Sequence, residues 1–167
     1  MMPDASVEEL QACKKLVEAS LRGDHQEVKE CLPQVQCKTW LGKGVWWGAC
    51  RGHTDVIKEI IEHDASVINK PLMSDGVTPL MIACHNGEVA AASLLASKGA
   101  SIYSVNTHGD CALDIALTSE AGQLQHYSIR REMVLSLLRC YPPSELKSLI
   151  RYVERQRPGL IKKEDRL

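Results

Sequence analysis

One segment of the chain repeats itself after 33 residues. Residues 76–83 and 109–116 read GVTPLMIA and GDCALDIA, so both follow the pattern Gly-x-x-x-Leu-x-Ile-Ala. A second pair of segments, which start at Gly52 and Gly87, repeats after 35 residues, and each runs into an apolar pair at 60–61 or 94–95. Periods of this length are typical of proteins built from stacked supersecondary units, none of which can bury its apolar face alone. We therefore expect a stack of similar units.

The residues around Thr78 carry the signals that begin and end a short helix. Thr78 can cap a helix N-terminus, and Pro79 is tolerated in a first turn. Gly87 can end the helix in a left-handed conformation. In another unit, residues 56–61 carry four apolar side chains at helical spacing. Each unit is therefore predicted to be a pair of helices.

Residues 73–100 resemble the ankyrin repeat, whose pattern is roughly D-x-x-G-x-T-P-L-H-x-A-A-x-x-G-H-x-x-V-V-x-x-L-L-x-x-G-A, and Thr78-Pro79-Leu80 is the most diagnostic match. Residues 41–65 resemble a degenerate copy, with GVW at 44–46 in place of PLH, and residues 16–32 resemble a first, capping copy. The last copy begins at Asn106 but carries about nine extra residues around 118–126, before a second helix expected at 130–139. The resemblance implies an all-α ankyrin-repeat solenoid of about four stacked helix pairs with short hairpin loops.

The expected organisation has three parts. Residues 1–9 form an N-terminal segment, residues 10–141 form the repeats (about 10–37, 38–70, 71–105 and 106–141), and residues 142–167 form a C-terminal helix and a charged tail. Residues 146, 149, 150 and 153 are apolar at i, i+3, i+4 and i+7, which predicts an amphipathic helix. This helix is expected to cap the last repeat, and a partner-binding role is the alternative.

Composition and charge exclude several classes of protein. A net charge of −1 argues against general affinity for nucleic acid. The longest mostly apolar run, 89–96, is far shorter than the roughly 20 residues that cross a bilayer. The seven cysteines form no CxxC pair, and the first residues, MMPD, lack the features of a secretory signal, which indicates a reducing compartment. We expect a monomer in the cytoplasm, with the nucleus as an alternative.

The resemblance implies a non-enzymatic protein-protein interaction module, an adaptor, inhibitor or scaffold subunit, that binds another protein on its concave surface. Alignment with the family pattern places this surface at the hairpin tips, which include Thr39 and Trp40, and at the exposed ends of the first helices. No nucleic acid, membrane, metal or cofactor is expected to bind. The residues predicted to contact the partner are Trp40, Trp46, Arg51, Ser74, Asp75, His85, Asn86, Thr107, His108 and Asp110.

Of the three tryptophans, at 40, 46 and 47, the first two are the candidate anchors. Neighbouring residues of a helix point about 100° apart, so we do not expect Trp46 and Trp47 both to be fully buried. Tryptophan and arginine are enriched in binding hot spots, and Trp40 or Trp46 beside Arg51 is the predicted main anchor. The alternative is that these rings cover the edge of the first repeat.

Two other functions stay as alternatives. A thiol enzyme or metal protein is formally available, but no segment resembles a nucleophile motif, and His108 and Cys111 have no second pair to complete a zinc site. A phosphatase-targeting subunit is suggested by KGVWW at 43–47, which fits the loose pattern K-x-V-x-W for docking on protein phosphatase 1, and by residues 109–116, which resemble part of a myosin phosphatase targeting subunit. Such docking needs an extended segment, whereas Val45 falls at a core position of a predicted helix.

Overall fold

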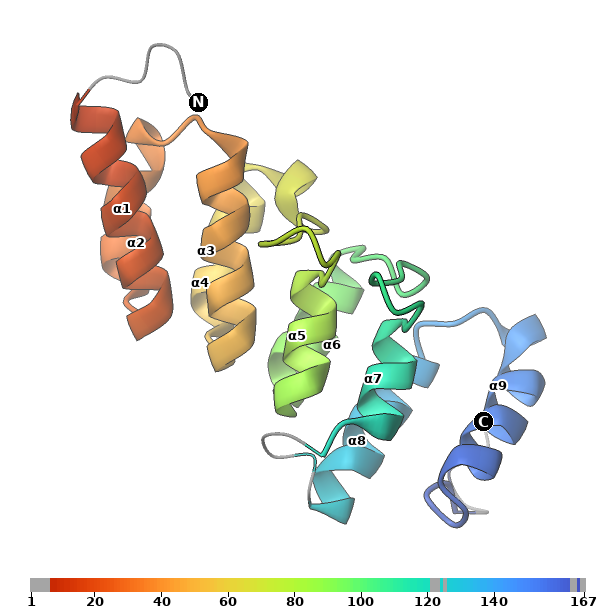
Figure 1. Cartoon of the computed structure of the whole chain (residues 1–167). Helices are drawn as coiled ribbons and strands as arrows, with labels where there is room; N and C mark the ends of the chain where they lie inside the picture. Colours follow the sequence, from red (N-terminus) through yellow and green to blue (C-terminus); the bar gives the residue numbers. More distant parts are fainter. Residues whose placement is uncertain (1–6, 121–123, 125, 163–164, 166–167) are drawn as a thin grey trace.

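The computed structural model describes residues 7–120, 124, 126–162 and 165 of the 167-residue chain. In these residues the regular structure is entirely helical, and the helices form two rows (Figure 1). The inner row contains α1, α3, α5 and α7, the outer row contains α2, α4, α6 and α8, and α9 lies beside α7 at the C-terminal end. The helices are α1 (Val7–Arg22), α2 (His25–Cys31), α3 (Lys38–Arg51), α4 (Thr54–His63), α5 (Pro79–Asn86), α6 (Val89–Ser97), α7 (Ala112–Thr118), α8 (Tyr127–Leu138) and α9 (Pro143–Gln156), with 3₁₀ turns at Leu32–Gln34 and Ala65–Val67.

The core lies between the two rows and runs the length of the stack. Each inner helix packs against the next inner helix and against its own outer helix, and the outer helices pack in the same order. The same position of each inner helix is buried, with exposed fractions of 0 or 1 %, at Leu16, Val45, Leu80 and Leu113. Apolar side chains of this size contribute roughly 1.5–3 kcal/mol each when they are fully buried. The repeats therefore stack in register, as the spacing predicts.

The helix signals around Thr78 act as predicted. The Thr78 hydroxyl accepts a hydrogen bond of 3.3 Å from the Met81 N–H, and Pro79 is the first residue of α5. Gly87 ends α5 with φ of 80°, in the left-handed conformation that glycine adopts without a steric penalty. Gly23 and Gly52 end α1 and α3 with positive φ in the same way.

These glycines also leave room for the next repeat. A Cβ atom at Gly23 would lie 2.6 Å from Nδ1 of His53, so the imidazole packs directly on the glycine backbone. The Nε2 atom of His53 is 3.3 Å from the carbonyl oxygen of Leu21, to which it donates. His53, which directly follows the glycine that ends α3, therefore holds the C-terminal end of α1, the inner helix of the preceding repeat.

The first two repeats lack the hairpin tips that the family alignment predicts. α1 begins at Val7, inside the expected N-terminal segment, and α3 begins at Lys38, which aligns with Met73 of the third repeat. Thr39 and Trp40 therefore lie in the first turn of α3, and their predicted placement on a tip is wrong. The physical reason is that residues 38–43 contain neither proline nor a Thr-Pro pair to set a later helix start, so the helix extends by about six residues toward its N-terminus.

The end of α7 is closed by an arginine instead of a glycine. α7 ends at Thr118, and Arg130 of α8 is 5 % exposed. Its Nη1 atom donates to the carbonyl oxygens of Ala116 at 3.0 Å and Leu117 at 2.8 Å, and its Nη2 atom donates to that of Ser119 at 2.7 Å. α8 begins three residues earlier than predicted, and part of the predicted insertion, 121–123 and 125, lies outside the described residues.

α9 covers the end of the inner row. Val153 is buried, and Leu146, Leu149 and Ile150 pack partly buried against the core, which confirms the amphipathic capping helix. The Tyr152 hydroxyl donates to Oδ1 of Asp114 on α7 at 2.6 Å. Leu160 and Ile161 are also buried, so the segment that follows α9 packs back onto the last repeat.

Candidate interaction surface

The solvent side of the inner row, together with the loops that precede α5 and α7, forms the surface that we call the inner face. Its two loop tips are joined, because the Thr107 N–H donates to the carbonyl oxygen of Asp75 at 2.9 Å. The Asp75 carboxylate accepts from the Val77 N–H at 3.1 Å, and the Asn106 side chain accepts from the N–H groups of His108 and Asp110. The tips are thus held by their own hydrogen bonds, and they expose Ser74, Asp75, Thr107 and His108 to solvent.

A hollow of about 340 Å³ lies between α5 and α7 on the inner face. His85 and Asp110 line it, and Nδ1 of His85 is 3.1 Å from the Ser119 hydroxyl. Asn86 has a different role, because its Nδ2 atom donates to the Cys50 carbonyl at 2.8 Å and approaches the Cys50 sulfur at 3.2 Å. His85 therefore faces a space that a partner could enter, whereas the Asn86 amide joins α5 to α3.

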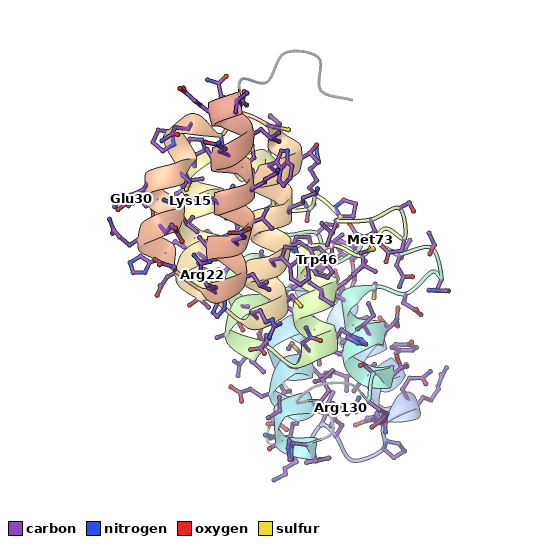
Figure 2. All side chains as sticks on the ribbon, turned by 60° about the vertical axis from the view of Figure 1, so that its left-hand side comes forward. Lys15, Arg22, Glu30, Trp46, Met73 and Arg130 are labelled. Carbon is purple, nitrogen blue, oxygen red and sulfur yellow. The ribbon has the colours of Figure 1, made fainter. Side chains whose placement is uncertain are left out.

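The solvent side of α3 carries the three tryptophans, each partly buried. The Trp46 indole N–H donates to the carbonyl oxygen of Val77 at 3.1 Å, and Figure 2 shows Trp46 on the side of α3 that faces the loop containing Met73. The Trp46 and Trp47 rings meet edge to face, with centroids 5.1 Å apart and an interplanar angle of 82°. The ammonium group of Lys43 lies 4.2 Å from the centroid of the Trp40 ring, within range of a cation–π interaction.

Charge is distributed unevenly along the inner face. α3 contains Lys38, Lys43 and Arg51 but no acidic residue. The Lys38 ammonium pairs with Asp64 at 3.5 Å, whereas Lys43 and Arg51 form no ion pair with any residue that the structure describes. The tips and the end of α7 carry the carboxylates of Asp75, Asp110 and Glu120 instead.

Glu120 is already engaged at the end of α7. It accepts a hydrogen bond from Arg157 and lies 3.3 Å from Nη2 of Arg130. The hydrogen bond from Arg157 and the charge of Arg130 lower the pKa of the Glu120 carboxyl. This carboxylate is therefore part of the closure of the last repeat rather than an open anchor.

Most of the predicted contact residues lie on one continuous face of the structure, where they form two groups. Trp40, Trp46 and Arg51 share the solvent side of α3, and the remaining exposed residues lie on the tips or beside the hollow. Lys43 and Trp47 also lie on the solvent side of α3, and the sequence reasoning did not count them among the contact residues. The sequence contains a pattern that could have identified them, because Lys43, Trp47 and Arg51 are spaced at i, i+4 and i+8 and therefore lie on one side of a helix.

Burial opposes thiolate formation at five of the seven cysteines. Burial raises the pKa of the Cys13 thiol to about 11, and burial also raises the pKa of Cys31, Cys84, Cys111 and Cys140. A reactive cysteine needs the opposite shift. No group of three or more histidine, cysteine or acidic residues in the described part of the chain is arranged to hold a metal ion.

The segment that matches the phosphatase-docking pattern is not extended. Residues 43–47 lie in the middle of α3, and the side chain of Val45 is completely buried in the core. Over the residues that the structure covers, no helix has the length and apolar character needed to span a membrane.

Comparison with known proteins identifies the repeats. A family model described as ankyrin repeats, in three copies, matches residues 45–142, which is more than half of the chain. No curated protein sequence gives a significant match. The matched region begins within α3, contains the third repeat with its complete Thr-Pro-Leu element, and continues through α8. The chain therefore belongs to the ankyrin repeat family.

Proposed function

We propose that this chain recognises another protein through its inner face and acts as an adaptor, inhibitor or scaffold subunit without catalysing a reaction. The observation that carries the proposal is the solvent side of α3, which carries the partly exposed rings of Trp40 and Trp46 and, at its last residue, the exposed Arg51. Tryptophan and arginine dominate the binding energy of protein interfaces when a partner desolvates them. The contact residues on the tips, Ser74, Asp75, Thr107, His108 and Asp110, and His85 beside the hollow would form the rest of the contact.

The stacked helices support this function because they hold the inner face rigid before a partner arrives. Binding to a preformed surface costs less conformational entropy than binding that must order a loop. Seven cysteines without a disulfide fit a protein of a reducing compartment, and we place it in the cytoplasm or the nucleus, as a monomer. The buried Val45 gives no support to the phosphatase-docking alternative, and the raised thiol pKa values give none to a thiol enzyme.

Affinity capture from a lysate with matched variants tests the proposal. The inner-face variant is Trp40→Ala with Arg51→Ala, and the control is Lys29→Ala with Lys58→Ala, two exposed residues of the outer helices α2 and α4. We expect proteins that are retained by the wild type and by the control but lost from the inner-face variant, while circular dichroism shows that all three chains are folded. If the inner-face variant retains the same proteins as the wild type, the assignment of the inner face is wrong.

A further inference from the structure

We propose that the inner face of α3 binds an extended acidic peptide in which two acidic residues flank one apolar residue at alternate positions, acidic-x-apolar-x-acidic. This inference rests on the proposed function and specifies the chemistry of the partner. It starts from the row formed by Lys43, Trp47 and Arg51, in which an aromatic ring stands between two cations.

The spacing of this row matches an extended chain. Along a helix, Lys43 and Arg51 are eight residues apart, which corresponds to about 12 Å at 1.5 Å per residue. In an extended peptide, residues i, i+2 and i+4 point to the same side, and they span about 13 Å at roughly 3.3 Å per residue. Carboxylates at the two outer positions can therefore reach both cations while the central side chain lies against Trp47.

The row lies on the open side of α3. A Cβ atom at Gly44 would lie 3.0 Å from the Ser20 hydroxyl of α1 and 2.8 Å from Ile60 of α4, so these two helices cover one side of α3. The bond from Asn86 to Cys50 marks the side that faces α5. At 100° per residue, the sector between these two sides has Trp47 near its centre, with Arg51 toward α1 and Lys43 toward α5.

The central position favours an apolar side chain. The edge-to-face contact with Trp46 holds the Trp47 ring, and both rings remain partly exposed to solvent. A ring fixed in this way offers a large apolar surface at little cost in side-chain entropy. A phenylalanine or leucine of the partner would bury the exposed part of these rings, which are otherwise in contact with water.

α5 contains no acidic residue, whereas α1 contains Glu8, Glu9 and Glu18, and the Glu88 carboxylate packs against the backbone of Gly52, next to Arg51. On α1, Leu10, Lys14, Val17 and Leu21 form a row at i, i+4, i+7 and i+11, opposite Lys15 and Arg22, which pair with Glu27 of α2. Leu10 and Leu21 are 39 % and 36 % exposed, so α1 extends the surface with one more cation and further apolar area. Lys43 and Arg51, which have no ion-pair partner among the described residues, leave positive and apolar surface that is complementary to an acidic, partly apolar segment.

Fluorescence polarisation with two labelled peptides tests the proposal. The first peptide is Gly-Ser-Glu-Gly-Phe-Gly-Glu-Gly-Ser, and the second has lysine in place of both glutamates. We expect the wild type to bind the acidic peptide about tenfold more tightly than the basic one, since each exposed ion pair changes affinity several-fold. Higher salt should weaken this binding. Because all three tryptophans lie on α3, binding should also change the intrinsic fluorescence.

Charge reversal provides the decisive variant. Lys43→Glu with Arg51→Glu should invert the preference between the two peptides, while the control Lys29→Glu with Lys58→Glu on the outer helices should keep it. Absence of binding of the acidic peptide to the wild type, equal binding of both peptides, or an unchanged preference in the reversal variant would each overturn the proposal. Equally tight binding of oligothymidine would overturn it in favour of a nucleic acid.

The two proposals fail in different ways. If protein capture depends on Trp40 and Arg51 but the peptides show no charge preference, the proposed function stands and the acidic partner is wrong. If capture does not depend on these residues, the proposed function is wrong whatever the peptides show.

Discussion

The guanidinium of Arg130 replaces a helix-ending glycine, and its removal should loosen the last repeat before the others. The first three inner helices end at glycines with positive φ, whereas α7 has none and leaves its last carbonyl groups to Arg130. Substitution of Arg130 by alanine removes all three donors, and the Leu117 carbonyl oxygen keeps only its hydrogen bond of 2.8 Å from Nε of Arg157. We therefore predict a large destabilisation of α7, α8 and α9.

The magnitude follows from the three hydrogen bonds and the cost of burial. A hydrogen bond from a charged donor contributes about 1.5–3 kcal/mol, so the lower end of this range gives about 4–5 kcal/mol for the three together. Burial lowers the pKa of Arg130, which shows that the charged form loses part of its hydration. This cost offsets part of the gain, and we expect Arg130→Ala to lower the free energy of unfolding by about 3 kcal/mol. Arg130→Lys keeps the charge but cannot reach all three oxygens, and should cost about half as much.

Urea unfolding followed by two signals measures the effect. Far-ultraviolet circular dichroism reports all helices, whereas tryptophan fluorescence reports only α3, because the chain has no tryptophan elsewhere. Stacked repeats are coupled mainly to their neighbours, so the dichroism transition of Arg130→Ala should move to lower urea and separate from the fluorescence transition. Arg155→Ala, at an exposed position of α9, is the control. A change below about 0.5 kcal/mol in Arg130→Ala, typical of a neutral surface site, would refute the role of Arg130.

Three further predictions concern the other contacts that hold the stack. Thr78→Ala should cost about 1 kcal/mol in urea unfolding, whereas Thr78→Ser should cost little, and equal losses would contradict the cap. Gly23→Ala should cost more than the roughly 1–2 kcal/mol of strain expected for Gly109→Ala, because only the former meets a neighbouring side chain, the histidine ring of the next repeat; an equal cost would show that this ring moves away freely. The hydrogen bond to Asp114 raises the pKa of Tyr152 to about 12, so this bond stabilises α9 below pH 10 and its contribution disappears as the pH rises toward 12. Burial opposes ionisation of Asp114, but its hydrogen bonds outweigh this effect and lower its pKa below 3.8, so the same contribution is present above pH 4 and is lost in acid. Tyr152→Phe should remove the alkaline dependence and weaken the acidic one, because the Cys111 N–H still donates to Asp114, and unchanged unfolding curves of the wild type across pH 3–12 would contradict the role of this bond.

The phase of the repeats could be predicted from the sequence because it depends on local signals. The cap at Thr78, the proline after it and the glycine at the end of α5 each act within one helix, and the structure confirms them. The buried position of each inner helix follows from the same alignment. Its separation in sequence from the glycine that ends the helix fixes the side of the helix on which it lies.

The closure of the last repeat could not be predicted, because it depends on residues far apart in the sequence. Arg130 reaches the carbonyl groups of α7 only after the chain has crossed the insertion between α7 and α8. Tyr152 meets Asp114 across 38 residues, and no spacing rule links the two positions. The early start of α3 was missed for a different reason, since a family pattern places a helix start by its Thr-Pro pair and gives no rule for a repeat that lacks the pair.

The glycines of α3 explain why its tryptophan-bearing side is held in place. Gly42, Gly44 and Gly48 lie inside this helix, where each costs roughly 0.5–1 kcal/mol relative to alanine. A Cβ atom at Gly44 would clash with Ile60, and one at Gly48 would lie 3.2 Å from Ile57, so the missing side chains allow α3 to lie close against α4. A helix with this composition is weak alone and depends on its neighbours for stability. α3 thus packs closely against α4 on one side and carries the three tryptophans on the other. Because the stack fixes the helix, its open face can serve as a rigid binding surface.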